Sequence, residues 1–335
     1  MNLPQGAPRA ALEAARLAPS AHNSQPARFR PDDESITLGW DSRRVLPAGD
    51  PQRHYLFTGL GASAESLRLG AALTGRRATI TWNLVASENS AASVDLSGDA
   101  PEPADAELAA AVGARQTTRL PFRSDSVAID LLGDLCSEAE AMGCRLAVVE
   151  GAKAMSEFAG LVAEGTARNL DDPQVYAEFF EWLRLRRSHP NHDRDGLSAA
   201  ALSLGRLQTL VGPVGMTPSA MRLLGHARLL GVLAGTQRRL ARRAPAACLL
   251  IAPSGSAGDR FTGGRAMLRV WIRATAMGLR VHPMTAAMDH TETRHALAAL
   301  FGVGPDAPMV VCFRTGYGPT GPRSPRLPLD ELLQY

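Results

Sequence analysis

The sequence has almost no lysine. Lys153 is the single lysine among 36 basic residues, and arginine carries the rest of the positive charge. Arginine forks suit phosphate and carboxylate recognition, but high-GC genomes also favour arginine, so this composition alone decides nothing. No basic run is interleaved with aromatic residues, and the formal net charge is only +3. The sequence therefore shows no footprint of nucleic-acid binding.

Long apolar runs are also absent. No stretch reaches transmembrane length, and residues 1–18 lack the apolar region of a signal peptide. The four cysteines have no CxxC spacing, and Cys248 and Cys312 lie in apolar runs typical of buried strands. There is no Ser/His/Asp elbow and no Walker or Rossmann glycine fingerprint. We expect reduced cysteines, no membrane segment and a cytoplasmic protein.

What remains is a chain of 335 residues with the composition of a globular protein, long enough for one large or two smaller domains. Its periodicity predicts strands at 35–40, 77–85, 92–96, 144–149, 246–252 and 308–313. It predicts helices at 50–74, 106–112, 130–142 and 265–278, and a long amphipathic region at 152–187. Residues 97–106 are rich in Pro, Ala and Asp and are interpreted as a linker between two halves. Residues 188–244 are interpreted as an insertion or lid.

The most informative stretch is residues 18–29, Ala-Pro-Ser-Ala-His-Asn-Ser-Gln-Pro-Ala-Arg-Phe. Pro19 stops the preceding helix, and Pro26 biases Gln25 toward an extended conformation. Short polar side chains between two prolines suit a polar planar ligand, although an ordinary helix-ending turn has the same composition.

Three further patterns accompany this loop. Arg115, Thr117 and Arg119 form an Arg-x-Thr-x-Arg segment with guanidinium and hydroxyl donors that could bind a phosphate. Residues 277–286 read Met-Gly-Leu-Arg-Val-His-Pro-Met-Thr-Ala, and the C-terminal region contains Arg314-Thr-Gly-Tyr-Gly-Pro followed by Arg323-Ser-Pro-Arg326. Each pattern alone is also typical of a charged surface turn or tail.

Together, and in this order, the four patterns resemble those of the nitroreductase superfamily of FMN-dependent oxidoreductases. The loop is similar to the family's Pro-Ser-Ser-x-Asn-x-Gln-Pro-Trp segment, with Ala21 and Ala27 replacing the second Ser and the Trp. Ala286 stands where many relatives have Gly, and Ser324 where many have a basic residue. The resemblance covers the chain apart from residues 188–244.

This resemblance implies a role for particular residues. Arg115 and Thr117 would serve the FMN phosphate, Arg119 would lie near flavin N1 and the C2 carbonyl, and backbone amides at about Thr285 would approach N5. His22 could face the substrate or stabilise the loop. The full set implied to contact the cofactor is Pro19, Ser20, Ala21, Asn23, Gln25, Arg115, Gln116, Thr117, Arg119, Pro283, Met284, Thr285, Ala286, Arg323 and Arg326.

The order of the motifs predicts a fused pseudo-dimer. No Arg-x-Thr-x-Arg segment precedes Pro19, and no second copy of the loop follows Phe122. Residues 1–100 would therefore be a truncated half that donates the loop, and residues 101–335 a second half carrying the rest of one flavin site. This layout resembles Acg-like proteins. It implies an α+β fold: two nitroreductase-like halves, each with a mixed or antiparallel sheet flanked by helices.

The implied activity is reduction of an electron-poor small molecule, such as a nitroaromatic or quinone, with NAD(P)H as donor and flavin-centred ping-pong chemistry rather than a catalytic side chain. Two alternatives stay open: a protein that sequesters a covered FMN, or a specialised dehydrogenase of a biosynthetic pathway. We expect a monomeric pseudo-dimer or a homodimer. His189, His192, Asp193 and Asp195 match no metal-ligand spacing and favour a polar turn, and His282 favours a structural or flavin-adjacent role.

Overall fold

Two antiparallel four-stranded sheets form the framework of the protein. A computed structural model describes residues 5–226 and 230–334. The first sheet has the order β1-β2-β4-β3 and the second β5-β8-β10-β9. The strands are β1 (Ala27–Pro31), β2 (Ser35–Trp40), β3 (Arg77–Val85), β4 (Ser90–Gly98), β5 (Arg145–Glu150), β8 (Ala246–Ile251), β9 (Arg280–Pro283) and β10 (Met309–Gly316).

The two sheets repeat one topology. In each, two strands are followed by a long helix and two more strands, and the fourth strand then inserts between the second and third. The long helices are α2 (His54–Ala72) in the first half and α10 (Ala257–Ala276) in the second. This confirms the prediction of an α+β fold with two fused halves. The boundary between residues 100 and 101 stays a prediction.

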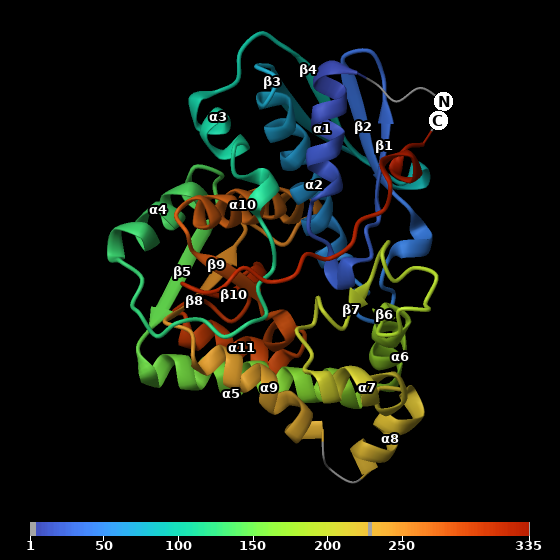
Figure 1. Ribbon diagram of the computed structural model, residues 1–335. Helices are drawn as coiled ribbons and strands as arrows, with labels where there is room; N and C mark the ends of the chain where they lie inside the picture. Colours follow the sequence, from blue (N-terminus) through green and yellow to red (C-terminus); the bar gives the residue numbers. More distant parts are fainter. Residues whose placement is uncertain (1–4, 227–229, 335) are drawn as a thin grey trace.

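The halves meet where α2 crosses α10, in the middle of the molecule in Figure 1. Glycine permits this crossing on both helices. A Cβ atom on Gly61 would lie 1.9 Å from the carbonyl oxygen of Phe261, and one on Gly264 would lie 1.9 Å from that of Thr58. Such distances are far inside van der Waals contact, so the two backbones touch directly and any side chain here would push the halves apart.

A buried ion cluster flanks the crossing. The Arg269 guanidinium on α10 donates to Glu65 at 2.8 Å, to Asp105 at 2.6 Å and to Glu138 at 2.5 Å. These carboxylates come from α2, from α3 (Pro103–Ala109) and from α4 (Ile129–Glu140). A buried charge must be fully paired to be tolerated, so this cluster fixes the relative position of four helices.

The second sheet is covered on both faces. One face packs on α10 and α4, and the other on α5 (Ala152–Asp171), α9 (Leu230–Arg242) and α11 (Thr291–Leu300), as Figure 1 shows. All six residues of β8 are buried, which explains its uninterrupted apolar sequence. Cys248 and Cys312 are buried and unpaired in this sheet, as predicted.

Three predicted helix boundaries were wrong for local reasons. Asp50 accepts the Leu56 N–H, but α2 itself begins at His54 because the residues before it form a turn. Helix α10 begins eight residues before the predicted Arg265, since Ser256 caps it by accepting the Asp259 N–H. Its end was predicted correctly: Gly278 follows with φ +79°. The short helix predicted at 106–112 is α3, which begins at Pro103.

The predicted amphipathic region at 152–187 is two helices rather than one. Helix α5 ends at Asp171, and α6 (Pro173–Glu181) begins with Asp172 as its cap, whose carboxylate accepts the Gln174 and Val175 N–H groups. The inserted segment then forms a short parallel pair, β6 (Leu183–Arg184) with β7 (Leu197–Ser198), followed by α7 (Arg206–Gly215) and α8 (Pro218–His226).

The C-terminal tail returns to the first half. Leu333 bridges Phe29 in parallel, and the Gln334 N–H donates to the Phe29 carbonyl, so the tail extends the edge of the first sheet beside α1 (Gly6–Arg16). Figure 1 shows the last turn of the tail, in red, beside β1 at this edge. On its way the tail passes the loop that follows α1.

Within the described ranges, the longest apolar helical stretches fall short of what a bilayer crossing requires.

Candidate functional site

The loop after α1 has an unusual backbone. His22, Asn23 and Gln25 have φ of 50°, 55° and 52°, a left-handed conformation that non-glycine residues seldom adopt. The extended conformation predicted for Gln25 before Pro26 was therefore wrong, because the turn held by Ser20 overrides the local preference. The Ser20 hydroxyl oxygen accepts the Gln25 N–H at 2.9 Å and helps to hold the turn. Residues in such conformations cluster at ligand clamps and active sites, and here three occur within four positions.

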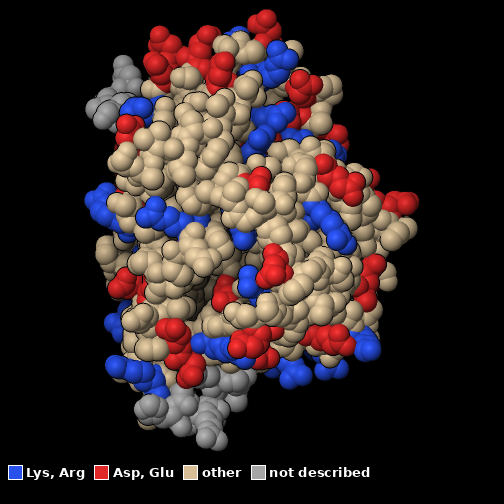
Figure 2. All heavy atoms as spheres, turned by 180° about the vertical axis from the view of Figure 1, so that it is seen from behind, with Lys and Arg blue, Asp and Glu red and all other residues tan. Residues whose placement is uncertain are grey.

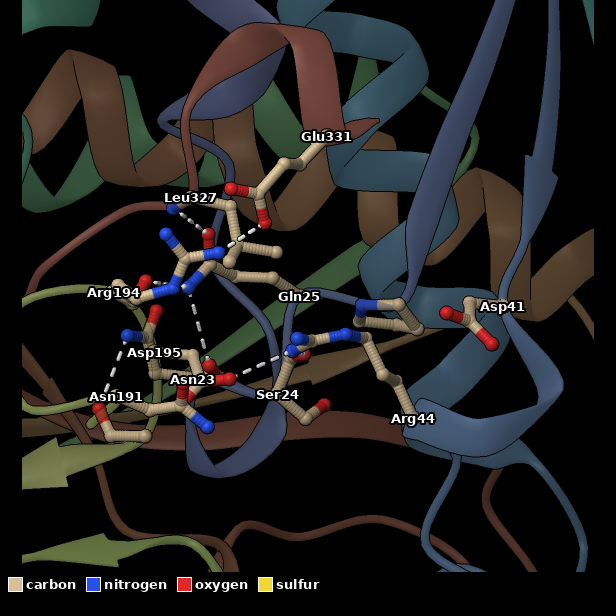
Figure 3. A network of polar contacts seen from close by, with 12 residues as sticks. Asn23, Ser24, Gln25, Asp41, Arg44, Asn191, Arg194, Asp195, Leu327 and Glu331 are labelled. Carbon is tan, nitrogen blue, oxygen red and sulfur yellow. Dashed lines mark hydrogen bonds and ion pairs between the residues drawn. The ribbon is translucent and has the colours of Figure 1, made fainter. Parts of the chain in front are cut away.

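The polar side chains of this loop bind two other segments. The Asn23 amide nitrogen donates to the Gly196 and Pro325 carbonyls at 3.1 and 3.0 Å. The Gln25 amide donates to the Arg194 carbonyl at 3.0 Å and accepts the Leu327 N–H at 2.9 Å. Figure 3 shows Gln25 of the loop together with Arg194 of the insertion and Leu327 of the tail.

Three arginines predicted for the cofactor gather beside the loop. Arg115 and Arg326 both donate to the Leu17 carbonyl, at 2.7 and 3.2 Å, and Arg326 also donates to the Asn23 side-chain oxygen at 2.8 Å. Arg115 also lies over the Trp271 ring, 4.7 Å from its centroid. Arg119 donates to the Ala201 carbonyl at 2.9 Å.

None of these three arginines pairs with a carboxylate in the described part of the chain, whereas Arg269 binds three. Arg115 is buried, and desolvation together with the charges of Arg326 and Arg323 lowers its pKa to about 9. Desolvation lowers the pKa of both Arg119 and Arg326 to about 10. Among the described residues, the site therefore concentrates positive charge that has no carboxylate partner.

Polar atoms without partners lie in the same segment. Both polar atoms of the buried Gln116 amide lack a hydrogen bond, as do the Thr118 hydroxyl and the Arg326 Nε. Buried polar groups are nearly always paired. These unpaired donors and acceptors therefore mark the segment as a candidate ligand-binding site. Of the other predicted residues, Thr117 bridges Val281, and Arg323 donates to the Gly113 carbonyl at 2.6 Å from an exposed position.

Desolvation and the charge of Arg119 lower the pKa of His22, while desolvation and the charges of Arg314 and Arg119 lower that of His282. The His22 ring meets Phe179 of α6 edge-on, with 5.1 Å between centroids, so α6, which precedes the insertion, covers it. His282 Nδ1 accepts from Arg314 Nε at 3.1 Å, which agrees with the structural interpretation of His282.

The pKa of His22, lowered to about 4, predicts a loss of stability in acid. The fold holds His22 neutral, so its contribution is complete above about pH 6.5 and is lost as the pH falls toward 4. Between pH 7 and 4 we expect wild type to lose about 2 kcal/mol more unfolding free energy than His22→Gln. Urea unfolding at both pH values measures this, with the exposed His295→Gln variant as control. Equal losses in wild type and His22→Gln would contradict it.

The segment at 283–286 follows β9. Pro283 pairs with Phe313, the Met284 N–H donates to the Cys312 carbonyl, and a 3₁₀ turn begins at Thr285. Helix α5 packs directly behind this turn, because a Cβ atom on Gly165 would lie 2.1 Å from the Ala286 carbonyl oxygen. The peptide groups at Thr285 and Ala286 are therefore held rigidly. Their predicted approach to the flavin stays a prediction.

A neighbouring pair was missed by the sequence analysis. The Tyr55 hydroxyl at the start of α2 donates to Asp289 at 2.5 Å, and the Asn169 amide donates to the other Asp289 oxygen at 2.7 Å. Desolvation raises the pKa of both Tyr55 and Asp289, and Thr285 lies within hydrogen-bonding reach of Tyr55. Asp289 nevertheless keeps solvent access.

The polar cluster around residue 190 forms turns. His192 Nδ1 contacts Asp193, while Asp195 is buried and bound by two arginines: Arg184 at 2.9 and 2.8 Å and Arg44 at 3.0 Å. Figure 3 shows Asp195 and Arg44 directed toward each other beside Ser24. No group of metal-ligating side chains that could hold an ion occurs among residues 5–226 and 230–334.

Comparison with known proteins gives nearly full-length relatives. A scan against protein-family models gives no match. The chain is 26% identical over 337 residues to the Mycobacterium tuberculosis protein named "Putative NAD(P)H nitroreductase Rv3131", covering 98% of this chain and 91% of the relative. It is 27% identical over 343 residues to "Putative NAD(P)H nitroreductase acg" of the same organism, covering 97% and 94%.

Among solved structures, the FMN-dependent nitroreductase NfnB of Mycobacterium smegmatis in complex with NADPH matches 68% of this chain and 97% of its own, with 20% identity and a TM-score of 0.45. The sequence similarity to the two M. tuberculosis proteins spans both halves and includes the insertion. Over nearly its full length the chain is thus similar to two proteins named as putative NAD(P)H nitroreductases, which confirms the resemblance that its motifs indicated.

Proposed function

We propose that this protein is an FMN-dependent oxidoreductase that takes electrons from NAD(P)H and reduces an electron-poor small molecule of the nitroaromatic or quinone type. The observation that carries the proposal is the group of three arginines, Arg115, Arg119 and Arg326, which lie beside the strained polar loop without a carboxylate partner. The names of the full-length relatives support it.

The residues present fit the phosphate end of FMN. A phosphate monoester carries a charge of about −1.5 to −2 and has oxygens that accept charge-assisted hydrogen bonds. Arg115 and Arg326 supply the compensating charge, and the unpaired Gln116 amide and Arg326 Nε supply donors. A buried cation without a counterion is costly, so binding of an anion here relieves a penalty that the flavin-free protein carries.

At the other end of the site, the protein would position and polarise the ring system. When bound, the flavin supplies the hydride and electron chemistry. Arg119 would place a cation near the N1 side, and the rigid peptide groups at Thr285 and Ala286 would donate or accept near N5. Tyr55 is protonated at neutral pH and donates its hydroxyl proton to Asp289, which orients the group. The hydroxyl oxygen would therefore be left to accept a hydrogen bond from a bound molecule.

The absorbance spectrum of the purified protein, before and after anaerobic addition of NADPH or NADH, tests this function. We expect flavin bands near one FMN per chain that bleach on addition of one or both nucleotides. A colourless protein that also takes up no added FMN would overturn the proposal. Two equivalent flavins per chain would overturn the assignment of one site to two fused halves.

A second candidate function is sequestration of a covered FMN with little turnover. It is favoured by the contacts that the insertion and the preceding helix α6 make to the site. In the insertion, Arg194 and Gly196 bind the loop amides and Ala201 binds Arg119, while Phe179 of α6 covers His22. The cover is also anchored, because Glu178 accepts the Ala48 and Gly49 N–H groups at 2.9 and 2.8 Å.

Asp195→Asn separates the two functions. The substitution preserves the shape but removes the charge that Arg184 and Arg44 neutralise, and breaking a buried pair costs about 3–5 kcal/mol. We therefore expect the insertion to loosen. If the flavin is sequestered, wild type resists reduction by NADPH and the variant is reduced at least tenfold faster in stopped flow. Rapid bleaching in wild type, unchanged in the variant, would instead establish the oxidoreductase. Asp193→Asn, which alters an exposed carboxylate nearby, is the control.

A further inference from the structure

Positive charge is concentrated in one part of the sequence. Residues 196–258 contain no aspartate or glutamate, although the chain has 33 acidic residues. The same stretch has seven arginines, which exceed the net charge of +3 of the whole chain, so the remainder is net negative. In Figure 2, basic side chains project at the lower edge of the molecule, where α8 and α9 lie in Figure 1, while acidic ones predominate at the upper edge.

Helix α7 presents apolar side chains to solvent. It packs through Gly212, where a Cβ atom would lie 3.3 Å from the Leu185 side chain. Leu210 and Val214 each stand two residues from Gly212, about 200° around the helix, and therefore point outward. Their side chains are 77% and 67% exposed, which is unusual for large aliphatic residues in two adjacent turns.

Helix α8 has the same arrangement. Met221 is 3% exposed and packs beside Tyr176, whose hydroxyl donates to the Met216 carbonyl at 2.7 Å. Leu223, two residues further along the helix, is 70% exposed. Arg222 is exposed next to it. Both helices thus bury one side against the segments around Tyr176 and Leu185 and present leucine or valine on the opposite side.

Helix α9 adds further charge at the same end of the molecule. Arg238 and Arg239 are exposed on the helix, and Arg242 and Arg243 are exposed at its C-terminal end. No acidic residue lies within this stretch to neutralise them.

We propose that the end of the molecule formed by α7, α8 and α9 binds the surface of a membrane that contains anionic lipids. Leu210, Val214 and Leu223 would enter the boundary between headgroups and acyl chains, and the arginines would contact lipid phosphates. A second copy of the chain fits less well, because a self-complementary contact through this surface would place like-charged arginines opposite one another. The proposal does not depend on the proposed function.

Vesicle co-sedimentation of the full chain tests the proposal. We expect binding to vesicles of phosphatidylcholine mixed with phosphatidylglycerol, weaker binding as salt is added, and little binding to pure phosphatidylcholine. Arg238→Gln combined with Arg242→Gln should weaken binding about fivefold for each arginine removed. The matched control is Arg30→Gln combined with Arg145→Gln, two exposed arginines on the edges of the sheets, which should bind like wild type.

A triple variant with Leu210→Ser, Val214→Ser and Leu223→Ser tests the apolar contribution. Because all three side chains are exposed, we expect the variant to fold normally and to lose vesicle binding, while Ile129→Ser on α4, which is 75% exposed, keeps it. Absence of binding to anionic vesicles at low salt would overturn the proposal. So would equal binding to neutral vesicles, binding to polyglutamate but not to vesicles, or a dimer in solution that the triple variant abolishes.

Discussion

Replacing Arg115 with Gln is expected to weaken FMN binding about 10- to 100-fold. A hydrogen bond to a charged group contributes about 1.5–3 kcal/mol, and each 1.4 kcal/mol is a factor of ten in affinity. Fluorescence titration of the flavin-free protein with FMN measures this directly. Arg326→Gln should have a similar effect, because both guanidinium groups converge on the Leu17 carbonyl. Arg145→Gln, at an exposed position of β5, is the matched control.

Thermal unfolding distinguishes an anion site from a structural arginine. In the absence of flavin, Arg115→Gln should not lower Tm, because it removes a desolvated charge that lies near Arg326 and Arg323. Added FMN should raise the Tm of wild type strongly and that of the variant little, since a ligand stabilises in proportion to RT ln(1 + [L]/Kd). Loss of stability in the flavin-free variant together with unchanged FMN affinity would show that Arg115 is structural.

Replacing Gly264 with Ala is expected to have the largest effect on folding. The added methyl group would lie 1.9 Å from the Thr58 carbonyl oxygen, which is backbone and cannot move aside as a side chain would. The two helices would have to separate, and overpacking of this kind costs about 3 kcal/mol or more. Gly61→Ala, on the facing helix, should behave in the same way because its methyl group would meet the Phe261 carbonyl.

The control is Gly133→Ala in α4, where a Cβ atom would meet no neighbouring heavy atom within 4 Å. Alanine has the higher helix propensity, so this variant should be more stable than wild type by about 0.5–1 kcal/mol. Urea denaturation of the three variants measures the contrast. A Gly264→Ala protein as stable as wild type would show that the halves do not depend on direct backbone contact at this crossing.

Much of the fold could be predicted from the sequence because the patterns that determine it lie within short stretches of the chain. The two halves follow from motif order, and β8 and β10 follow from continuous apolar runs. The loop, Arg115 and Arg326 were assigned to one site, and the structure does bring them together around Leu17 and Asn23. Their role in holding FMN stays a prediction until binding is measured.

The rest depends on contacts between segments far apart in the chain. Tyr55 and Asp289 are separated by 234 positions, and no spacing rule links them. The hydrogen bonds from Asn23 and Gln25 to residues 194–196 could not be predicted either, since a polar side chain in a loop does not indicate which distant group it will bind. The predicted start of a helix was wrong where a single capping residue determines it, as Ser256 does for α10.

The crossing of α2 and α10 also has a consequence for dilution. In an assembly of separate subunits, a site made from two of them is lost when the protein concentration falls below the dissociation constant. Here the loop after α1 and the arginines of the second half belong to one covalent chain. Their encounter is intramolecular, with an effective concentration set by the linkage rather than by the number of molecules present. The assembled site should therefore persist even at a few copies per cell.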